Sequence, residues 1–319
     1  MNALRQSARD GAAYTLGGPQ VAGPLAVFPV FGPEPRLEYR AFVHAAELGA
    51  FVKEVESGAM VTRLSVENPT DLPLLVYEGE EVLGAQQNRT FDVSALVPAG
   101  ERVLVPVSCV ERGRWDHTRH MEAFRPSPQA ADPSLRRTKR AAANAAGRVN
   151  QNEVWAEVSG RLVEHGVHSH SEAMSDLYER RRADLDPLGL AIRHVDGQIG
   201  AIACASGQPM ALDLVSRAEV FAALLPALAQ GYALDALGGT EPEPDPQQAE
   251  FFLRSALAPP RRERRTVGLG RAFVLGTDAP IGAGLEHEGE LIQLAAFPAD
   301  GSARRPGPRV ARPSRRRRS

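Results

Sequence analysis

The sequence contains few of the residues that define several common protein classes. Only two of its 319 residues are cysteines, and no C-x-x-C pair occurs, which argues against a structural zinc site. Cys109 and Cys204 each lie in an apolar, strand-like run and are expected to be small buried side chains. No run of about 18 apolar residues is present, so we expect no membrane partner. The N-terminus has no apolar signal core, which predicts a cytoplasmic protein.

Several motifs for catalysis and nucleotide binding are also missing. The sequence has no G-x-G-x-x-G turn, no P-loop, no G-x-S-x-G elbow and no evident cysteine–histidine pair, which removes several common enzyme classes. The histidines of HGVHSH (residues 165–170) and HTRH (residues 117–120) have spacings that can bind a metal. No matching ligand follows on a strand, so we assign no metal site and leave the cofactor unknown.

Lysine is almost absent, and arginine supplies nearly all of the positive charge. Two lysines accompany 35 arginines, which is typical of a GC-rich coding bias. The net charge of −2 conceals a split: residues 304–319 contain eight arginines and no acid, and the remainder has 29 basic and 39 acidic residues. This tail is either a disordered, solubilising end or a segment that binds nucleic acid. No other part of the chain is expected to bind nucleic acid.

The pattern of apolar residues predicts an α+β fold, because runs of strands alternate with helical segments without regular βαβ winding. Residues 1–20 are predicted to form a flexible arm. Residues 21–300 are predicted to form one α+β domain, and residues 301–319 a disordered, arginine-rich tail.

Within this domain, an antiparallel β-rich unit is expected over residues 25–113, a helical stretch over residues 116–185 and a mixed region over residues 189–297. Two turn sequences predict β-hairpins, because each lies between two apolar runs: NPTD at residues 68–71 and DG at residues 196–197. The domain therefore combines packed antiparallel sheets with a layer of helices.

Helix starts are predicted at several places. Residues 169–172 and 216–219 both read S-x-x-E, the pattern of a capping box. Asp245 followed by Pro246 fits an N-cap and a first helical turn. Apolar residues spaced by four across residues 154–162 predict an amphipathic helix.

The richest concentration of chemically capable side chains lies between Glu78 and Trp115. Apolar runs of β character alternate there with carboxylates, carboxamides and guanidinium groups. Strands normally bury one face and expose the other, so such groups at strand ends are typical of a polar pocket on a β scaffold. The residues concerned are Glu78, Glu80, Glu81, Gln86, Gln87, Asn88, Arg89, Glu111, Arg114 and Trp115.

Glu80 and Glu111 are the candidate catalytic residues. Glu78 and Glu80 would share one face of a strand, and Glu111 comes from a later strand that could converge on them. Two carboxylates held close together can act as acid and base, or can bind a hard cation. The alternative is a solvated turn at the end of a strand.

Gln87, Asn88, Arg89, Arg114 and Trp115 are the candidate ligand-binding residues. The two arginines have the planar fork that suits phosphate or carboxylate, and the indole can stack on a base. The carboxamides can orient a ligand by hydrogen bonds. The alternatives are ion pairing for the arginines and a packed core position for Trp115.

The stretch EGEEVLGAQQNRTFDVSALVPAGERVLVPVSCVERGRW (residues 78–115) resembles the signature of the ADP-ribosylglycohydrolase- and rhodanese-phosphatase-associated protein family, which is bacterial. NQNEVWAEV, GQIGAIACASGQPMALDLV and QGYALDAL also resemble that family, so the similarity covers about residues 25–240. The family has no settled activity. Its name implies ADP-ribose or NAD-derived metabolites.

The resemblance therefore implies a chain that binds or processes a phosphorylated nucleotide-like metabolite, with ADP-ribose or an NAD derivative favoured. Two alternatives stay open. One is a metal- or carboxylate-dependent hydrolase that uses Glu80 and Glu111. The other is a non-catalytic interaction protein whose basic tail binds nucleic acid.

Overall fold

A computed structural model describes residues 13–55, 62–120, 122–258, 260–275 and 280–299. The arginine-rich tail lies outside these residues, so the prediction that it binds nucleic acid also falls outside the described part of the chain. Within the described part of the chain, none of the helices combines the length and apolarity needed to cross a bilayer. The α+β fold is confirmed.

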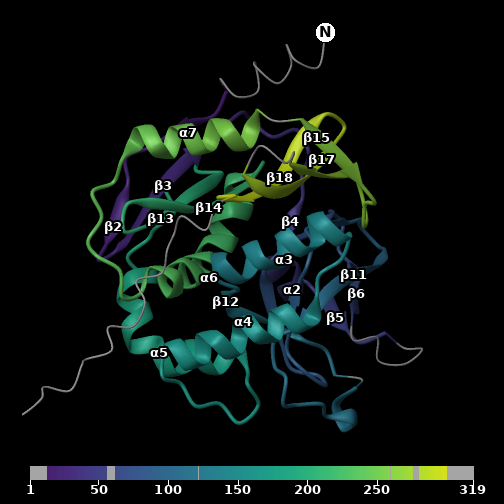
Figure 1. The fold of residues 1–319 in the computed structure, drawn as a ribbon. Coiled ribbons are helices and arrows are strands. Elements are labelled where there is room, and N and C mark those ends of the chain that lie inside the picture. The colour runs from purple at the N-terminus through teal and green to yellow at the C-terminus, as the bar shows by residue number, and fades with distance from the viewer. Residues whose placement is uncertain (1–12, 56–61, 121, 259, 276–279, 300–319) are drawn as a thin grey trace, which may run out of the picture.

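A nine-stranded antiparallel sheet forms one layer of the molecule (Figure 1). Its strands in spatial order are β1 (Thr15–Leu16), β3 (Leu25–Phe31), β13 (Gly200–Ala205), β14 (Gln208–Val215), β18 (Glu290–Phe297), β17 (Ile281–His287), β16 (Arg271–Leu275) and β15 (Arg261–Arg264), with β2 (Gln20–Ala22) also paired to β3. Residues 13–20, which were expected to belong to a flexible arm, therefore already contribute β1 to the sheet.

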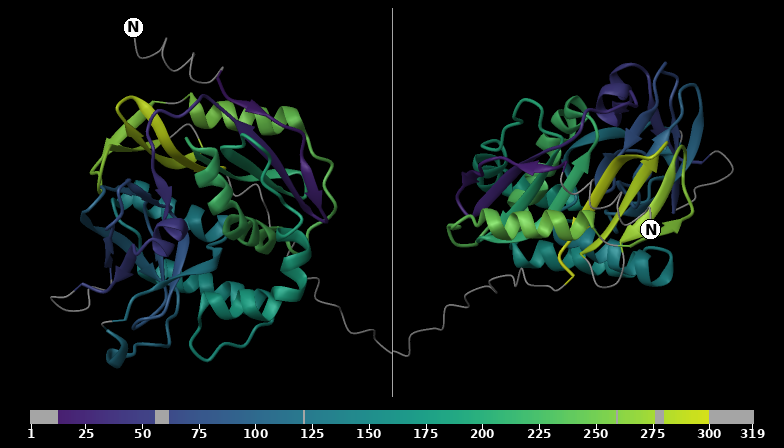
Figure 2. Two further views of the ribbon diagram at one scale, coloured as in Figure 1. Left: turned by 180° about the vertical axis from the view of Figure 1, so that it is seen from behind. Right: turned by 90° about the horizontal axis from the view of Figure 1, so that it is seen from above.

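Two smaller sheets form a second β unit, drawn in blue and purple in Figure 2. One has six strands in the order β12 (Arg125–Ala130), β8 (Glu80–Leu83), β9 (Arg89–Phe91), β11 (Arg102–Cys109), β6 (Arg63–Glu67) and β5 (Phe51–Lys53). The other has the order β10 (Ala95–Val97), β7 (Leu74–Val76) and β4 (Arg40–Ala41). Alternate side chains of these strands build a shared core, in which Phe42, from the short helix after β4, packs edge to face against Phe91.

The hairpin predicted at residues 68–71 is wrong. β6 pairs with β5 and β11, whereas β7 pairs with β4 and β10, so the strands on either side of the turn belong to different sheets. The Asn68 side chain explains the route, because it donates hydrogen bonds to the carbonyl oxygens of Leu72, Val97 and Pro98. These bonds fix a loop that carries the chain from one sheet to the other.

The hairpin predicted at residues 196–197 is also wrong. A helix extends to Gly189 on its N-terminal side, and no strand is assigned between that helix and β13. β13 pairs instead with β3 and with β14, and the β13–β14 turn is formed by Ser206 and Gly207. Their φ angles of 48° and 81° are those of the primed turns that suit a twisted hairpin.

Helices cover both faces of the nine-stranded sheet, with α6 (Ala218–Ala236) on one face and α7 (Pro246–Leu257) on the other (Figures 1 and 2). The other helices of the described residues are α2 (Phe42–Glu47), which packs on the second β unit, α3 (Pro133–Ala146), α4 (Gln151–Glu164) and α5 (Met174–Gly189), with a 3₁₀ turn η1 at His117–Arg119. Along β3, Leu25 and Val27 join the core on the α6 side, and Phe28 and Val30 join the core on the α7 side. The strand is therefore apolar on both faces.

The predicted helix starts give mixed results. The amphipathic helix over residues 154–162 is confirmed as part of α4, and the Asp245 cap of α7 is confirmed, because its carboxylate accepts from two backbone N–H groups. Both capping boxes are wrong, since α5 and α6 begin without a side-chain cap. Glu172 accepts a hydrogen bond from Ser159, and Ser216 bonds to the Tyr39 hydroxyl instead. Partners outside the two helices therefore bind Glu172 and Ser216, whereas Ser169 donates to Asp176 within α5.

Candidate functional site

The loop that joins β8 to β9 lies in the stretch from Glu78 to Trp115 that the sequence singled out. It spans residues 84–88 and runs through the left-handed region, with φ of 119° at Gly84 and 41° at Ala85. An alanine rarely adopts such an angle, and the strain persists only where the surroundings fix the backbone. Here the Ala85 carbonyl oxygen accepts a hydrogen bond of 2.7 Å from Arg114.

Arg114 fastens this loop to the end of β11. Its Nε donates to Glu111 Oε1 at 2.8 Å and its Nη2 donates to Glu111 Oε2 at 2.6 Å, a two-pronged pair. Arg114 Nη2 also donates to Asn88 Oδ1 at 3.0 Å, and the Asn88 backbone N–H donates to Glu111 Oε2 at 3.1 Å. Three predicted site residues are thus mutual partners.

Arg89 is fully buried and is connected to Glu111 through Gln87. Its Nη1 donates to the backbone oxygen of Gln87 at 3.0 Å and to Gln87 Oε1 at 2.8 Å. The Gln87 amide in turn donates to the Glu111 backbone oxygen. The guanidinium carbon of Arg89 stands 5.4 Å from the ring centroid of Trp115, a cation–π contact.

The structure therefore brings six of the seven predicted site residues into one connected set. We call it the Arg89 cluster. Its members are Gln87, Asn88, Arg89, Glu111, Arg114 and Trp115.

Glu54 lies beside the Arg89 cluster and was not predicted. Its Oε1 lies 3.5 Å from Arg89 Nη2, and both side chains are fully buried. Burial raises the pKa of Glu54, and the nearby Arg89 and His120 partly oppose that shift. Glu54 directly follows the short strand β5, in a segment (FVKEV) with no recognisable motif. Nothing in that segment could have indicated its place.

Several buried polar atoms of Glu54 and Arg89 have no hydrogen bond with the described residues. Both oxygens of Glu54, and Nε and Nη2 of Arg89, form no hydrogen bond with any described residue. Buried polar atoms are nearly always hydrogen-bonded, so four atoms without a hydrogen bond in one place need an explanation, although Glu54 Oε1 and Arg89 Nη2 form an ion pair with each other. They can serve one ligand that carries both an acceptor and a donor.

Glu80 lies apart from this arrangement. Its Oε2 accepts a hydrogen bond of 2.6 Å from the Tyr77 backbone N–H, and burial raises its pKa to about 8. The neighbouring Glu81 accepts from Ser127 at 2.9 Å and from Gln129 at 2.6 Å, and burial also raises its pKa to about 8. Across the described chain, the hydrogen-bonding partners of Glu80 differ from those of Glu111.

A second buried set of charges connects α3 to the nine-stranded sheet. Arg136 Nη1 donates to Asp213 Oδ2 at 2.9 Å, and its Nη2 donates to Asp213 Oδ1. The hydroxyls of Tyr77 and Tyr232 donate to the same carboxylate at 2.7 Å and 2.5 Å. Burial alone would raise the pKa of Asp213, but Arg136 and the two hydroxyls hold it below its ordinary value.

Two further basic residues on the same face of α3 complete this second set. Arg140 pairs with Glu78, and Lys139 Nζ lies 2.9 Å from an oxygen of Asp92. Burial lowers the pKa of Lys139, and Asp92 partly opposes the shift. The spacing of Arg136, Lys139 and Arg140 (i, i+3, i+4) places all three on one face of a helix, a signal that sequence reasoning missed.

The two histidines of HTRH, His117 and His120, contact Gln86 in the loop between β8 and β9. His117 Nδ1 and the Gln86 amide nitrogen are 3.4 Å apart, and His120 Nδ1 and the Gln86 amide oxygen are 3.3 Å apart. Among the described residues, no three histidine, cysteine, aspartate or glutamate side chains are grouped so that they could hold a metal ion. The two rings instead fasten η1 to the buried loop.

Comparison with known proteins then identifies the family. A model of the ARG and Rhodanese-Phosphatase-superfamily-associated Protein domain, ARPP-1, matches residues 13–297. The chain belongs to the ARPP-1 family. No curated protein and no solved structure matches it. The ARPP-1 name associates the family with enzymes that handle ADP-ribose, and the match covers nearly all of the described residues, beyond the 25–240 expected.

Proposed function

We propose that this chain binds a phosphorylated nucleotide-like metabolite at the Arg89 cluster, with ADP-ribose or an NAD derivative favoured. One observation supports the proposal above the others. Among the described residues, a buried guanidinium and a buried carboxylate 3.5 Å apart keep four atoms without a hydrogen bond, beside an indole ring. The family name supplies the chemical neighbourhood.

Each part of such a ligand has a matching group. Nε and Nη2 of Arg89 can donate to phosphate oxygens, and the Glu54 carboxylate can accept from ribose hydroxyls, as acidic residues do in dinucleotide-binding proteins. Trp115 can stack on the base. Arg114 is engaged by Glu111, so its role is to position the loop that carries Asn88 and Ala85.

We expect Trp115 to respond when a ligand enters the site. Arg89 is fully buried, and the indole stacks against its guanidinium group. A ligand that contacts Arg89 therefore displaces the ring or changes its surroundings. Binding should thus change the fluorescence of Trp115.

The geometry favours binding over hydrolysis by a carboxylate pair. In the hydrolase alternative, Glu80 and Glu111 would have to act on the same bond. Glu80 instead accepts from the Tyr77 N–H, and both oxygens of Glu111 are occupied by Arg114. A Glu80→Gln variant that binds ADP-ribose but loses turnover would favour the hydrolase.

Thermal-shift titration against ADP-ribose, NAD and AMP tests the proposal. A ligand present at 100 times its Kd should stabilise the fold by about 2.7 kcal/mol. Glu54→Gln, which keeps the size of the side chain but removes its charge, should weaken binding of the ribose-containing ligands. Arg112→Ala is the control, because Arg112 lies between Glu111 and Arg114 in the chain but has 58% of its side chain exposed and pairs with Glu172. No stabilisation of the wild type by any of the three ligands would refute the proposal.

A further inference from the structure

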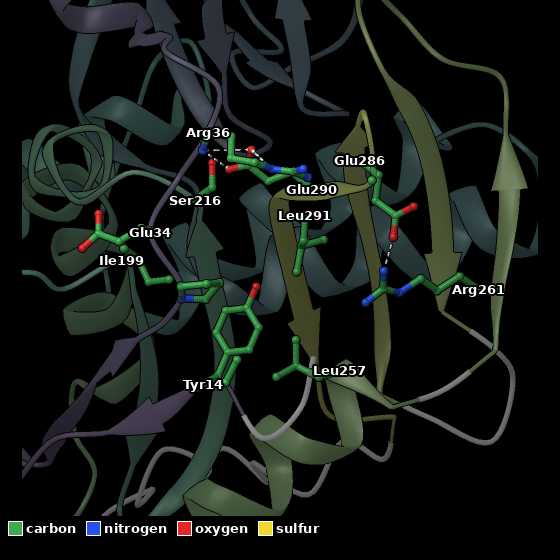
Figure 3. Close-up of a pocket in the computed structure, with 13 residues that line it drawn as sticks. Tyr14, Glu34, Arg36, Ile199, Ser216, Leu257, Arg261, Glu286, Glu290 and Leu291 are labelled. Carbon is green, nitrogen blue, oxygen red and sulfur yellow. Dashed lines mark hydrogen bonds and ion pairs between the residues drawn. The ribbon is translucent and has the colours of Figure 1, made fainter. Parts of the chain in front are cut away.

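A cavity of about 230 Å³ lies at the nine-stranded sheet (Figure 3). It is formed by the loop after β3, the turn between β17 and β18, the start of β15 and the end of α7. None of the described residues that line it belongs to the Arg89 cluster. It therefore offers a separate place for a small molecule.

One side of the cavity is apolar. The ring of Tyr14 and the side chains of Ile199, Leu257 and Leu291 line it in Figure 3. Ile199 and Leu257 are buried, so this wall is set by the packing of the sheet against α7. Such a wall suits an apolar group of about the size of one side chain, because the cavity is smaller than the roughly 300–1,000 Å³ of sites for drug-sized ligands.

The rim on the other side has charges of both signs. Glu290 accepts hydrogen bonds of 3.1 and 3.2 Å from the backbone N–H groups of Arg36 and Leu37, which fixes its carboxylate in the wall. The Arg36 guanidinium is the exposed member of this wall, with 71% of its side chain exposed; its Nη2 donates to the Glu288 backbone oxygen at 3.2 Å, and its Nε lies 3.8 Å from Glu290. Arg36 can therefore turn toward a bound anion.

The second charged wall repeats this combination. Glu286 pairs with Arg261, and its other oxygen lies 3.7 Å from Arg271. Both carboxylates, Glu286 and Glu290, are largely buried, with 21% and 14% of their side chains exposed. A ligand with a single charge would face a group of the same sign on each wall, which is unfavourable at short range.

We propose that this cavity binds a small zwitterion with an apolar side chain, such as an apolar α-amino acid. The ligand carboxylate pairs with Arg36, and the ligand ammonium group pairs with Glu286 or Glu290. The apolar side chain packs against Tyr14, Leu257 and Leu291. The inference stands apart from the function proposed for the Arg89 cluster.

Isothermal titration of the full chain with L-leucine and L-phenylalanine tests the inference. We expect saturable binding of at least one of them, and much weaker binding of 2-phenylethylamine and 3-phenylpropionate, which each lack one charge. Arg36→Ala should weaken amino-acid binding by at least about tenfold. The control Arg254→Ala, an arginine of similar exposure (69%) on α7 that does not line this cavity, should bind as the wild type does.

Two further variants separate the possible outcomes. Leu291→Trp should fill the cavity and abolish binding, and its melting temperature shows whether it folds. Glu54→Gln should leave amino-acid binding unchanged, so the two proposed sites can fail independently. The inference is overturned if neither amino acid binds the wild type, if the singly charged analogues bind as tightly, or if Arg36→Ala binds normally.

Discussion

Replacing Arg136 by methionine should remove the only strong cationic partner that the described structure gives Asp213, and leave a carboxylate with no exposed surface. Arg136 holds Asp213 by two hydrogen bonds, and both side chains are buried, at 1% and 0% exposure. Breaking a buried pair in this way typically costs about 3–5 kcal/mol, because an uncompensated charge remains in the interior. The two tyrosine hydroxyls that still bond Asp213 favour the lower end of that range.

Urea unfolding followed by circular dichroism measures this loss. The control Arg254→Ala removes an exposed i, i+4 pair with Glu250 and should change the free energy of unfolding by no more than about 0.5 kcal/mol. The double variant Arg136→Met, Asp213→Asn should recover part of the loss, because the orphaned charge is gone. A loss below about 1 kcal/mol for Arg136→Met would refute the reasoning, since that is the range of an exposed pair.

The pH dependence of the same pair has a definite sign. The pKa of Asp213 is lower in the folded chain than its ordinary value, so the folded state favours the ionised form. This contribution is fully present above the ordinary pKa of an aspartate, about 3.9, and is lost as the pH falls through the lower, folded pKa. Stability of the wild type should therefore fall in acid more steeply than stability of the double variant.

Three further predictions concern single features. Burial raises the pKa of Glu81 in the folded chain to about 8, so wild-type stability should fall as the pH rises from the ordinary pKa of a glutamate to about 8. Glu81→Gln should lessen this fall in pH-dependent melting curves, and an unchanged slope would contradict the prediction. Asp245→Ala removes the side-chain cap of α7 and should cost about 1 kcal/mol in urea unfolding, whereas no loss would mean that the cap is dispensable. Deleting residues 304–319 should abolish any steeply salt-dependent affinity for nucleic acid in fluorescence anisotropy, and retained affinity would remove the tail from that role.

Local patterns in the sequence predicted much of the fold, and long-range pairing explains what they missed. Apolar spacing located α4, and Asp245 with Pro246 located the start of α7, because both signals act within a few residues. The turn at residues 68–71 was recognised as a turn but assigned to a hairpin. Its role depends on carbonyl oxygens near Val97, about thirty residues away, which no local signal reports.

The candidate site shows the same division. Gln87, Asn88 and Arg89 could be singled out because consecutive carboxamides and an arginine are unusual at a strand end. Glu54 could not, because only the pairing of β5 with β6, and of β6 with β11, brings it beside Arg89. Glu80 was grouped with Glu111 because a later strand could bring Glu111 beside it, and the turn at Tyr77 gives Glu80 a different partner.

Fluorescence titration of a Trp155→Phe variant tests the central claim most directly, because Trp115 is then the only tryptophan. Adding ADP-ribose should change the emission of Trp115 in a saturable way, and the midpoint should move to a higher concentration in Glu54→Gln but not in Arg112→Ala. An emission that stays constant, while calorimetry on the same sample shows ADP-ribose bound, would place the ligand elsewhere. No response by either method would contradict nucleotide binding at the Arg89 cluster.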